Sequence, residues 1–466
     1  MLEKMNSAGQ KECNNSLFTL DIPVWYERSG KVSPIWLSIC EKERSQTTNL
    51  LEKVAEIVNL EKAYKQVKKN GGSSGVDKMS IEEFGKWFKD NYRLLISEIL
   101  TGNYQPQLVK GVKIPKPKGG YRQLGIPTIK DRVIQQAIKQ VLEPIYDPKF
   151  SEQSYGFRPK RNAHQALKRA SEIVKSGKTL VVDLDLAKFF DEVNHQRLMW
   201  LLSTRIGDKR LLKLIHRILK TGILEGGIEN QRIKGTPQGS PISPLLSNIV
   251  LDELDQELNR RELEFVRYAD DVKIFVKSQE SAERVYESIV KFIENKMKLK
   301  VNREKSKIQE SYKVNFLGYS LLYKGKLGLS QSSEDRLKDK IREITKRNRG
   351  VSLEQIIYEL ENKLRGWLNY FILAEMKSKL QKIEGWIRRK LKCYRLKQCK
   401  RVISIVRFLT KLGVEKTLSW RTALSGKGWW RLSNSPALKI GMNNQWFKEH
   451  GLYSLTENYK RLHREF

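Results

Sequence analysis

The sequence has few of the side chains that bind soft metals or form disulfides. Of its 466 residues, four are cysteine and five are histidine. The cysteines (Cys13, Cys40, Cys393 and Cys399) form no C-x-x-C pair. This spacing disfavours a zinc site and a disulfide framework, and it favours reduced thiols in a cytoplasm.

Long hydrophobic runs are also missing. No apolar stretch approaches the ~18 residues that a membrane-spanning helix needs. The opening sequence, MLEKMNSAGQKECNN, contains acids and has no apolar centre. We therefore expect no membrane partner, and this end resembles neither a signal nor a transit peptide.

Acidic residues are strongly outnumbered. Asp and Glu total 53 against 88 Lys and Arg, which gives a formal net charge of +35 at pH 7 and a pI near 9.9. With 39% hydrophobic and 30% charged residues, the chain has the composition of a folded protein. Such an excess favours a polyanionic partner, above all nucleic acid, because Lys and Arg displace counterions from phosphates. The expected location is therefore the cytoplasm, in association with the nucleoid; a generally basic protein without such a partner is the plain alternative.

Hydrophobic spacing predicts helices alternating with short strands from about residue 50 to 320, which is typical of an α+β or α/β body. Ser80 has an acid three residues later and is expected to cap the next helix. The segment 128–146 is expected to be a helix that stops before Pro144. VKIPKPKGGYRQLGIPT reads as two strands joined by a Gly-Gly turn, and from about residue 333 onward no strand is predicted.

Two adjacent carboxylates interrupt the apolar stretch FVRYADDVKIFVK, residues 265–277. The pattern predicts two strands around a tight turn that carries Asp270 and Asp271. Like charges side by side favour a bound cation. Asp is also an ordinary turn residue, so this stretch alone favours a plain hairpin.

A second stretch, TLVVDLDLAKFFDEVNH, is an apolar strand that ends in charge. Period-two alternation places Asp183 and Asp185 on one face of it. Carboxylate oxygens suit Mg²⁺, which binds through carboxylates together with phosphate oxygens. Two such ions, ~3.5–4 Å apart, would activate a 3′-hydroxyl and stabilise a leaving pyrophosphate, which is polymerase chemistry.

Several blocks of the sequence, in one order, resemble a known family. RYADD, DLAKFFDEV, GTPQGSPISPLLSNIVLDEL, KLKVNREKSKI and VNFLGYSL resemble the catalytic blocks of reverse transcriptases. IPKPKGGYRQLGIPTIKDRVIQQA and YGFRPKRNAHQAL resemble the finger segments of group II intron-encoded reverse transcriptases, and LRGWLNYF and GKGWWRLSNSPALKIGMNNQWFKEHGLYSL resemble their maturase region. The resemblance extends over about residues 50 to 460.

This resemblance implies an α+β right-hand polymerase followed by helical and basic regions. Fingers and palm would occupy residues 49–325, a helical thumb and maturase region 326–412, and a nucleic-acid-binding region 413–466, with 1–48 of unknown role. The implied activity is copying of RNA into DNA, together with splicing and mobility of an intron. The implied partners are an RNA template (its own intron RNA), a DNA primer or target, dNTPs and two Mg²⁺ ions, with Mn²⁺ as a substitute. The oligomeric state stays open, a dimer included.

The missing C-x-x-C pairs further imply a member without the His-Asn-His endonuclease domain. Two other functions fit much of the same sequence. One is a reverse transcriptase recruited to phage defence, DNA repair or CRISPR adaptation. The other is a non-enzymatic splicing factor or RNA chaperone, which leaves the carboxylate strands unexplained.

The resemblance also assigns the metal and catalytic residues. The metal ligands would be the side chains of Asp185, Asp270 and Asp271 and the main-chain carbonyl of Leu186. Asp185 is preferred to Asp183 because an aromatic residue follows it at the family's spacing of five. Lys305 would assist the departure of pyrophosphate, with Lys300 and Lys307 as close rivals.

Further residues would bind the nucleotide, the primer and the template. For the nucleotide they are Lys116, Arg122, Phe190, Gln238 and Gly239. Arg and Lys suit a triphosphate, and the ring of Phe190 would exclude a ribose 2′-hydroxyl, although core packing is its plain alternative. For primer and template they are Tyr268, Phe316, Leu317, Gly318 and Tyr319, of which FLGY could equally be a buried strand end.

The run RRKLKCYRLKQCKR, residues 388–401, holds eight basic residues and no acid. As a helix it would carry charge nearly all round, so it is not expected to be one side of a core helix, and nucleic acid backbone is its natural partner. Tryptophans in GKGWWRLSNSP could stack on unpaired bases or be buried. The candidate nucleic-acid-binding residues are therefore Arg388, Arg389, Lys390, Lys392, Arg395, Lys397, Lys400, Arg401, Trp429 and Trp430.

Overall fold

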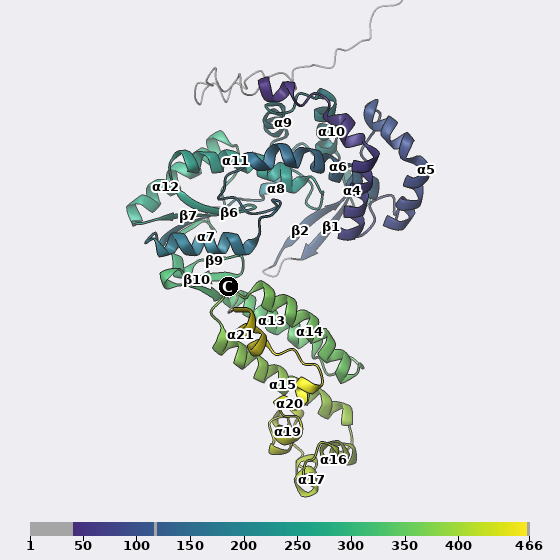
Figure 1. Cartoon of the computed structure of the whole chain (residues 1–466), viewed down its shortest axis with the longest axis vertical. Coiled ribbons are helices and arrows are strands. Elements are labelled where there is room, and N and C mark those ends of the chain that lie inside the picture. The colour runs from purple at the N-terminus through teal and green to yellow at the C-terminus, as the bar shows by residue number, and fades with distance from the viewer. Residues whose placement is uncertain (1–40, 116–118, 464–466) are drawn as a thin grey trace, which may run out of the picture. The chain divides into compact units, whose positions relative to one another are not determined.

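The computed structural model of the chain describes residues 41–115 and 119–463 (Figure 1). These residues form two compact units. The first contains the described residues up to Arg169 together with Gly177–Gln309, and the second contains Ala170–Ser176 and the residues from Glu310 onward. Helices and short strands alternate in the first unit, as the sequence predicts.

The first unit contains two four-stranded sheets. One has the order β2-β1-β4-β5 and the other the order β6-β7-β3-β8, whose last strand ends at the boundary between the units. The strands are β1 Val109–Pro115, β2 Tyr121–Ile126, β3 Leu180–Asp185, β4 Ile223–Glu225, β5 Ile228–Asn230, β6 Glu264–Tyr268, β7 Asp271–Val276 and β8 Lys307–Glu310. The expected hairpin is confirmed: β1 and β2 pair antiparallel, from Lys110 opposite Ile126 to Pro115 opposite Tyr121.

Helices surround these sheets, and α12 contacts β3 and β7 while α11 contacts β6. The predicted cap is confirmed, because the Ser80 side chain accepts from the Glu83 amide and the Glu83 side chain accepts from the Ser80 amide. The helices of this part are α3 Leu50–Ala55, α4 Ile57–Asn70, α5 Ile81–Leu100, α6 Ile129–Tyr146, α7 Ala163–Lys175 (which runs into the second unit), α8 Phe189–Glu192, α9 His195–Ser203, α10 Lys209–Lys220, α11 Ser243–Arg260 and α12 Gln279–Lys291.

The expectation that α6 stops before Pro144 is wrong. The helix continues to Tyr146, although proline has no N–H and so cannot donate to the carbonyl of Gln140. Leu142 and Tyr146, on either side of the proline, are 0% and 2% exposed. Burial of these two side chains therefore outweighs the loss of one backbone hydrogen bond.

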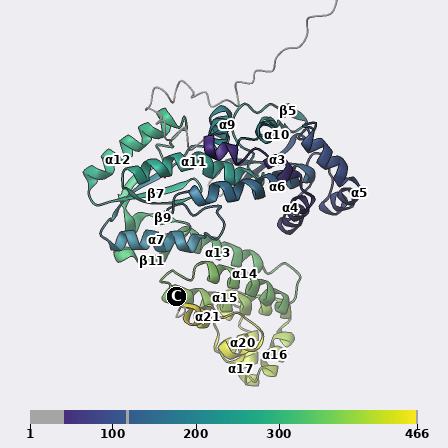
Figure 2. The same cartoon turned by 45° about the horizontal axis from the view of Figure 1, so that its top comes forward.

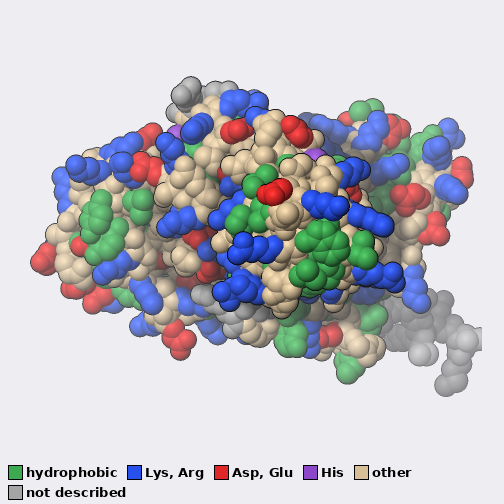
Figure 3. Space-filling model, turned by 90° about the horizontal axis from the view of Figure 1, so that it is seen from below, with side chains coloured by type: hydrophobic (Ala, Val, Ile, Leu, Met, Phe, Trp, Pro, Cys, Tyr) green, Lys and Arg blue, Asp and Glu red, His purple; other side chains and the backbone are tan. Residues whose placement is uncertain are grey.

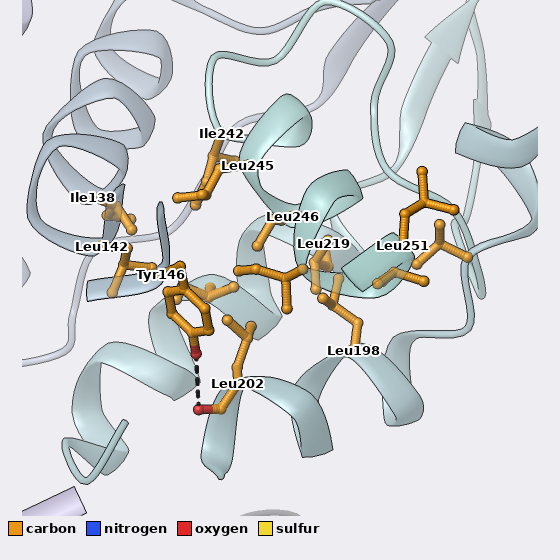
Figure 4. Close-up of a cluster of buried hydrophobic side chains, with 14 of the residues drawn as sticks. Ile138, Leu142, Tyr146, Leu198, Leu202, Leu219, Ile242, Leu245, Leu246 and Leu251 are labelled. Atoms are coloured by element: carbon orange, nitrogen blue, oxygen red, sulfur yellow. Dashed lines mark hydrogen bonds between the residues drawn. The ribbon is translucent and has the colours of Figure 1, made fainter. Parts of the chain in front are cut away.

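The core beside α6 is built from leucines and isoleucines of α6, α9, α10 and α11 (Figure 4). Tyr146 reaches across it, and its hydroxyl donates to the carbonyl of Leu202 at 3.3 Å. Burial raises the pKa of Tyr146 well above its ordinary value, so the hydroxyl stays neutral. Burial of each leucine contributes roughly 1.5–3 kcal/mol to the free energy of folding. This core therefore stabilises the position of α11, which contacts β6.

The second unit is mainly helical (Figure 2). Its long helix α15 contacts α14, α16, α18 and α21. Its elements are β9 Asn315–Phe316, β10 Tyr319–Leu321, β11 Leu327–Leu329, α13 Gln331–Ile344, α14 Leu353–Tyr370, α15 Lys377–Cys399, α16 Val402–Lys411, α17 Lys416–Ala423, α18 Trp429–Leu432, α19 Pro436–Gly441, α20 Asn444–Glu449 and α21 Leu455–His463. The prediction of no strand after about residue 333 is confirmed for the described residues.

Within the described ranges, no helix combines the length and the apolar character that crossing a membrane requires.

Candidate active site

The central antiparallel pair of the second sheet gathers the predicted carboxylates. In the register of β3 with β7, Asp183 lies opposite Lys273 and Asp185 lies opposite Asp271. Residues directly opposite each other in such a pair share a face, and the alternating face carries Val182 and other core side chains. The prediction that Asp183 and Asp185 share a face is thus confirmed, and Asp271 joins them on it.

Asp270 occupies the turn between β6 and β7. Tyr268 pairs with Asp271, so the turn consists of Ala269 and Asp270 alone. Ala269 has a φ of 58°, a strained value for a residue with a Cβ. Gly156 packs against this turn so closely that a Cβ on it would lie 2.2 Å from the amide nitrogen of Ala269. The strain is therefore maintained by close packing, as is common at functional sites.

A buried arginine supports the same turn from the core side. Arg267 and Asp255 of α11 form an ion pair whose side chains are both 0% exposed. The guanidinium donates from Nε to Asp255 Oδ1 at 2.7 Å and from Nη2 to Oδ2 at 2.5 Å. Its Nη1 donates to the carbonyl of Ala269 at 2.9 Å and to Asn248 Oδ1 at 3.0 Å. One fully paired cation thus ties the turn to α11.

Lys273 lies on the carboxylate face, and its side chain is only 4% exposed. Its ammonium donates to Asp271 Oδ1 at 2.5 Å and to Asp183. Burial alone would lower the pKa of Lys273, but the charges of Asp271 and Asp183 outweigh it and raise that pKa above its ordinary value. Desolvation likewise raises the pKa of Asp271, and the charge of Lys273 opposes that shift.

These side chains line a hollow of about 330 Å³ in the first unit, with Asp183, Leu184, Asp185, Asp270, Asp271, Lys273 and Lys305 in its wall. The side chains of Asp185 and Asp271 are 43% and 39% exposed, so both are open to a ligand. Lys305 places its ammonium 3.7 Å from Asp185 Oδ2. Its rival Lys300 lies instead 3.8 Å from Glu192.

The donor set of the hollow fits a hard divalent cation, because its ligands are carboxylate oxygens beside open space. Across the described residues, no three acidic, histidine or cysteine side chains converge closely enough to surround one ion. In the same hollow, Lys273 donates to oxygens of both Asp183 and Asp271. Leu186 is 5% exposed and forms an antiparallel bridge with Val301, which fixes its backbone beside Asp185.

The loop from Gly235 to Ser240 contacts helix α8 and strand β2 of this unit. The amide of Thr236 donates to the carbonyl of Phe190 at 2.6 Å, and the carbonyl of Gln238 accepts from the amide of Gly125 in β2 at 2.8 Å. Gly239 has a φ of 117°, and a Cβ there would lie 2.6 Å from the Gly125 carbonyl oxygen. Only glycine fits that position, so Gln238, Gly239 and Phe190 are held in one region by backbone contacts.

Phe190 and Phe189 differ in burial, as expected of a pair in which one residue packs. Phe189 is 2% exposed, while Phe190 is half-buried and meets it edge-on, with ring centroids 5.4 Å apart. Arg122 is exposed on β2, opposite Ile114, and Tyr268 is half-buried on the carboxylate face. Lys116 lies outside the described residues.

In the second unit, FLGY forms a tight hairpin. Phe316 pairs with Tyr319, and the two turn residues Leu317 and Gly318 have φ values of 53° and 84°, as in a type I′ turn. Phe316 and Tyr319 are both 0% exposed. The side chains of that pair are therefore core, and only the turn residues, which are half-buried, reach the surface.

The expectation that the run 388–401 is not one side of a core helix is wrong. The run covers the whole second half of α15 and the two residues after it, and Leu391, Cys393, Tyr394 and Leu396 within it are buried. The basic side chains between them, Lys392 and Arg395, are half-buried, as long cationic side chains are when their stems lie along apolar surface. Figure 3 shows Lys and Arg side chains spread over one face of the molecule, so positive charge is not confined to this helix.

Several of these basic groups have partners inside the protein. Arg389 lies 3.9 Å from the ring of Trp430 and donates to its carbonyl at 3.0 Å, and Trp430 remains 43% exposed. Arg395 lies 4.6 Å from the ring of Phe408. Burial, together with the charges of Arg388 and Lys439, lowers the pKa of Lys392 to about 8.

The other candidates of the run differ in exposure. Lys397, Lys400 and Arg401 are exposed, whereas Lys390 and Trp429 are half-buried. Exposed charges at the end of α15 and beyond it are therefore the most accessible to a nucleic acid.

Comparisons with known proteins identify the family. Residues 114–321 match the family model described as reverse transcriptase (RNA-dependent DNA polymerase), and residues 335–412 match the group II intron, maturase-specific domain. The chain is 32% identical to Protein YkfC of Escherichia coli (strain K12) over 63% of its own length and 86% of YkfC. It is 30% identical to Group II intron-encoded protein LtrA of Lactococcus lactis subsp. cremoris over 66% of its own length and 60% of LtrA. The chain belongs to the group II intron-encoded reverse transcriptases.

This membership confirms the resemblance drawn from the sequence. The first matched region is a reverse transcriptase fold of helices and sheets, whose activity is RNA-directed DNA polymerisation, and the second has a role in intron splicing. Reverse transcriptases generally use a divalent metal. A chain of the solved structure "Partial Cas6-RT-Cas1--Cas2 complex" is 27% identical in sequence, with a TM-score of 0.35. The alignment covers 55% of the present chain and 43% of that chain.

Sequence reasoning missed the buried supports of this reverse transcriptase site. Arg267, Asp255, Asn248 and Lys273 were not among the predicted site residues, although two of them stand in the quoted stretch FVRYADDVKIFVK. The signal in the sequence was a single basic residue inside each of the two apolar strands, Arg267 in the first and Lys273 in the second. A charge at such a position requires a partner when the strand is buried.

Proposed function

We propose that the hollow over the carboxylate face of β3 and β7 is the site where this reverse transcriptase joins a deoxynucleotide to a primer paired with RNA. The observation that carries this proposal is the register that sets Asp185 opposite Asp271, with Asp270 in the adjoining turn. Opposed carboxylates on an open sheet face repel each other unless a cation joins them. A polymerase needs such a cation, since phosphoryl transfer depends on positioning and on neutralising charge.

In this proposal the carboxylates of Asp185, Asp270 and Asp271, with the carbonyl of Leu186, hold two Mg²⁺ ions, or Mn²⁺ in their place. Bound there, the ions would lower the charge repulsion between the primer hydroxyl and the triphosphate. Lys305 lies beside Asp185 and is exposed, so it is free to approach the leaving pyrophosphate.

Other residues of the first unit would place the nucleotide. Arg122, with Lys116, would grip the triphosphate from the β1–β2 hairpin, where Arg122 is exposed. The half-buried ring of Phe190 would lie against the sugar, and the loop at Gln238 and Gly239 would lie under the base pair. Tyr268 would contact the primer, and in the second unit the turn at Leu317 and Gly318 would do so as well.

The proposed division is a right hand. Residues 49–325 would supply fingers and palm, 326–412 the thumb and maturase region, and 413–466 a nucleic-acid-binding region. The match of residues 335–412 to the maturase-specific domain supports a second activity, in which the chain binds its own intron RNA and assists splicing. Binding of this kind uses basic and aromatic side chains and needs none of the aspartates. Copying the intron RNA at a DNA target would then move the intron.

One pair of assays tests both activities on the same variant. Asp270→Asn should abolish primer extension on an RNA template, because it removes a proposed metal ligand without changing the shape of the turn. The same protein should still ligate exons of a transcript of its surrounding DNA at low Mg²⁺. Asp90→Asn is the matched control, since Asp90 is an exposed carboxylate on α5 and should leave both activities unchanged.

The outcomes separate the functions that fit the sequence. Extension and splicing by the wild type, with extension alone lost in Asp270→Asn, establish a reverse transcriptase that is also a maturase. Robust extension without splicing favours a reverse transcriptase recruited to defence or repair. Splicing without extension by the wild type leaves a splicing factor and refutes the proposed reaction.

A further inference from the structure

Lys273 is a buried cation directly beneath the candidate active site. It lies in the interior of β7, and its side chain is 4% exposed. By contrast, the other lysine of the hollow, Lys305, is 70% exposed. The charge of Lys305 can therefore move and is screened by water, whereas the charge of Lys273 is fixed in place by its surroundings.

The position of Lys273 follows from strand alternation. It lies two positions after Asp271 on the same strand, with only Val272 between them, and it is directly opposite Asp183 on β3, so the three side chains share one face. Its ammonium donates to Oδ1 of Asp271 and to Oδ1 of Asp183. Two carboxylates so close together destabilise a sheet unless a cation lies between them.

The two carboxylates bonded by Lys273 differ in access to the hollow. Asp183 is 20% exposed and Asp271 is 39% exposed. Asp183 is thus mostly buried against Lys273. Asp271 is bonded to Lys273 through Oδ1 alone, and its side chain remains accessible to solvent. The hollow contains four carboxylates and two lysines, so the net charge available to attract cations depends strongly on Lys273.

We propose that Lys273 is a positioning residue: its ammonium fixes the orientation of the Asp271 carboxylate and cancels the charge of Asp183, and it thereby sets how tightly the hollow binds divalent cations. This inference rests on the proposed function of the hollow. It adds a built-in cation to the site, which keeps the carboxylate face folded when no metal is bound and weakens the field that a metal experiences.

The decisive variant is Lys273→Met, which keeps most of the apolar stem and removes the charge. Without Mg²⁺ its carboxylates repel each other, so its melting temperature in EDTA should be lower than that of the wild type. With Mg²⁺ the more negative hollow should bind the ion more tightly, and the Mg²⁺ concentration at the midpoint of stabilisation should fall roughly three- to tenfold, as for loss of one charge in a partly solvated site. The primer extension rate at saturating Mg²⁺ should also fall, because Asp271 loses its fixed orientation.

Three further variants separate charge from packing. Asp183→Asn combined with Lys273→Met restores the charge balance and should return the Mg²⁺ midpoint toward that of the wild type. Lys273→Arg keeps the cation and should shift the midpoint less than Lys273→Met. Lys277→Met is the matched control, because Lys277 is an exposed lysine just after the same strand.

The first measurement is thermal unfolding of the full chain as a function of MgCl₂, which requires no catalysis. An unchanged midpoint in Lys273→Met, or an equal change in Lys277→Met, overturns the inference. If Lys273→Met does not fold, a folded double variant supports a role of charge, and failure of both shows a packing role and overturns it. If Lys273→Met shifts the Mg²⁺ midpoint but the wild type extends no primer, the proposed function is refuted. The role of Lys273 in cation binding would then still stand.

Discussion

The buried ion pair between Arg267 and Asp255 gives the sharpest prediction about stability. Asp255→Asn preserves the shape of the side chain but replaces one accepting oxygen with an NH₂ group. That group would face a guanidinium nitrogen, so a donor would meet a donor where an ionic hydrogen bond of 2.7 or 2.5 Å exists now. The arginine would remain charged, since its guanidinium does not lose its proton in proteins.

The magnitude follows from burial. Both side chains are 0% exposed, so no water can replace the lost partner. Removing one member of such a pair costs about 3–5 kcal/mol, because it leaves an uncompensated buried charge. A folded domain is stable by only about 5–15 kcal/mol in total. The substitution should therefore consume a large part of the stability of the first unit.

Hydrogen exchange read out by mass spectrometry measures this locally, in peptides that cover β6 and β7. At about 1.4 kcal/mol per factor of ten, the loss corresponds to exchange about a hundred- to several-thousand-fold faster. Peptides from the second unit serve as the internal control. Exchange in β6 and β7 indistinguishable from that of the wild type would refute the reasoning.

A compensating variant tests the cause. Arg267→Met combined with Asp255→Leu removes both charges and leaves only the carbonyl of Ala269 and the Asn248 side chain without a donor. Each of these two groups costs about 1–3 kcal/mol when unsatisfied, but replacing both buried charges by apolar side chains offsets about 1–4 kcal/mol, so the double variant should be more stable than Asp255→Asn. If the double variant is as unstable as Asp255→Asn, the loss comes from packing and not from a buried charge.

Three further predictions address other sites. Phe190→Ala should raise the incorporation of ribonucleotides relative to deoxynucleotides in primer extension, because a smaller side chain leaves room for a 2′-hydroxyl. Burial and the nearby charge of Asp255 raise the pKa of Asp252 from 3.8 to about 6, so its ionised form is disfavoured in the folded state. In urea unfolding, Asp252→Asn should therefore stabilise the chain by about 1–2 kcal/mol at about pH 7 and above, and this effect should disappear below about pH 3. Glu384 accepts from the amide and the hydroxyl of Thr456, in the first turn of α21, at 2.8 and 2.6 Å. Glu384→Ala should therefore weaken the attachment of α21 by about 1–2 kcal/mol and increase cleavage of this helix in limited proteolysis.

The local geometry of the carboxylates could be predicted from the sequence. Alternation alone placed Asp183 and Asp185 on one face, and the apolar stretches around Asp270 and Asp271 predicted a hairpin, which the structure contains. What alternation could not provide was the pairing of β3 with β7, because strand partners distant in sequence are chosen by tertiary packing. The family resemblance supplied that link.

Other features escaped prediction because tertiary contacts decided them. Pro144 should end a helix on local grounds, yet burial of Tyr146 extends α6 past it. The basic run in α15 carries charge nearly all round, yet this helix packs against α14, α16, α18 and α21, because Leu391, Tyr394 and Leu396 are buried between its charges. Composition describes such a helix as solvated, whereas only the fold shows which stems are covered.

Alternation also explains why the hairpin has two buried cations with different tasks. Arg267 lies opposite Val272, whose face is the core, whereas Lys273 lies opposite Val266 and shares its face with Asp271. From the core side, Arg267 holds the backbone of the turn through the Ala269 carbonyl. From the open side, Lys273 holds a carboxylate. The turn between them is therefore fixed on both faces, and Asp270 can project from a strained turn without loosening the strands that carry it.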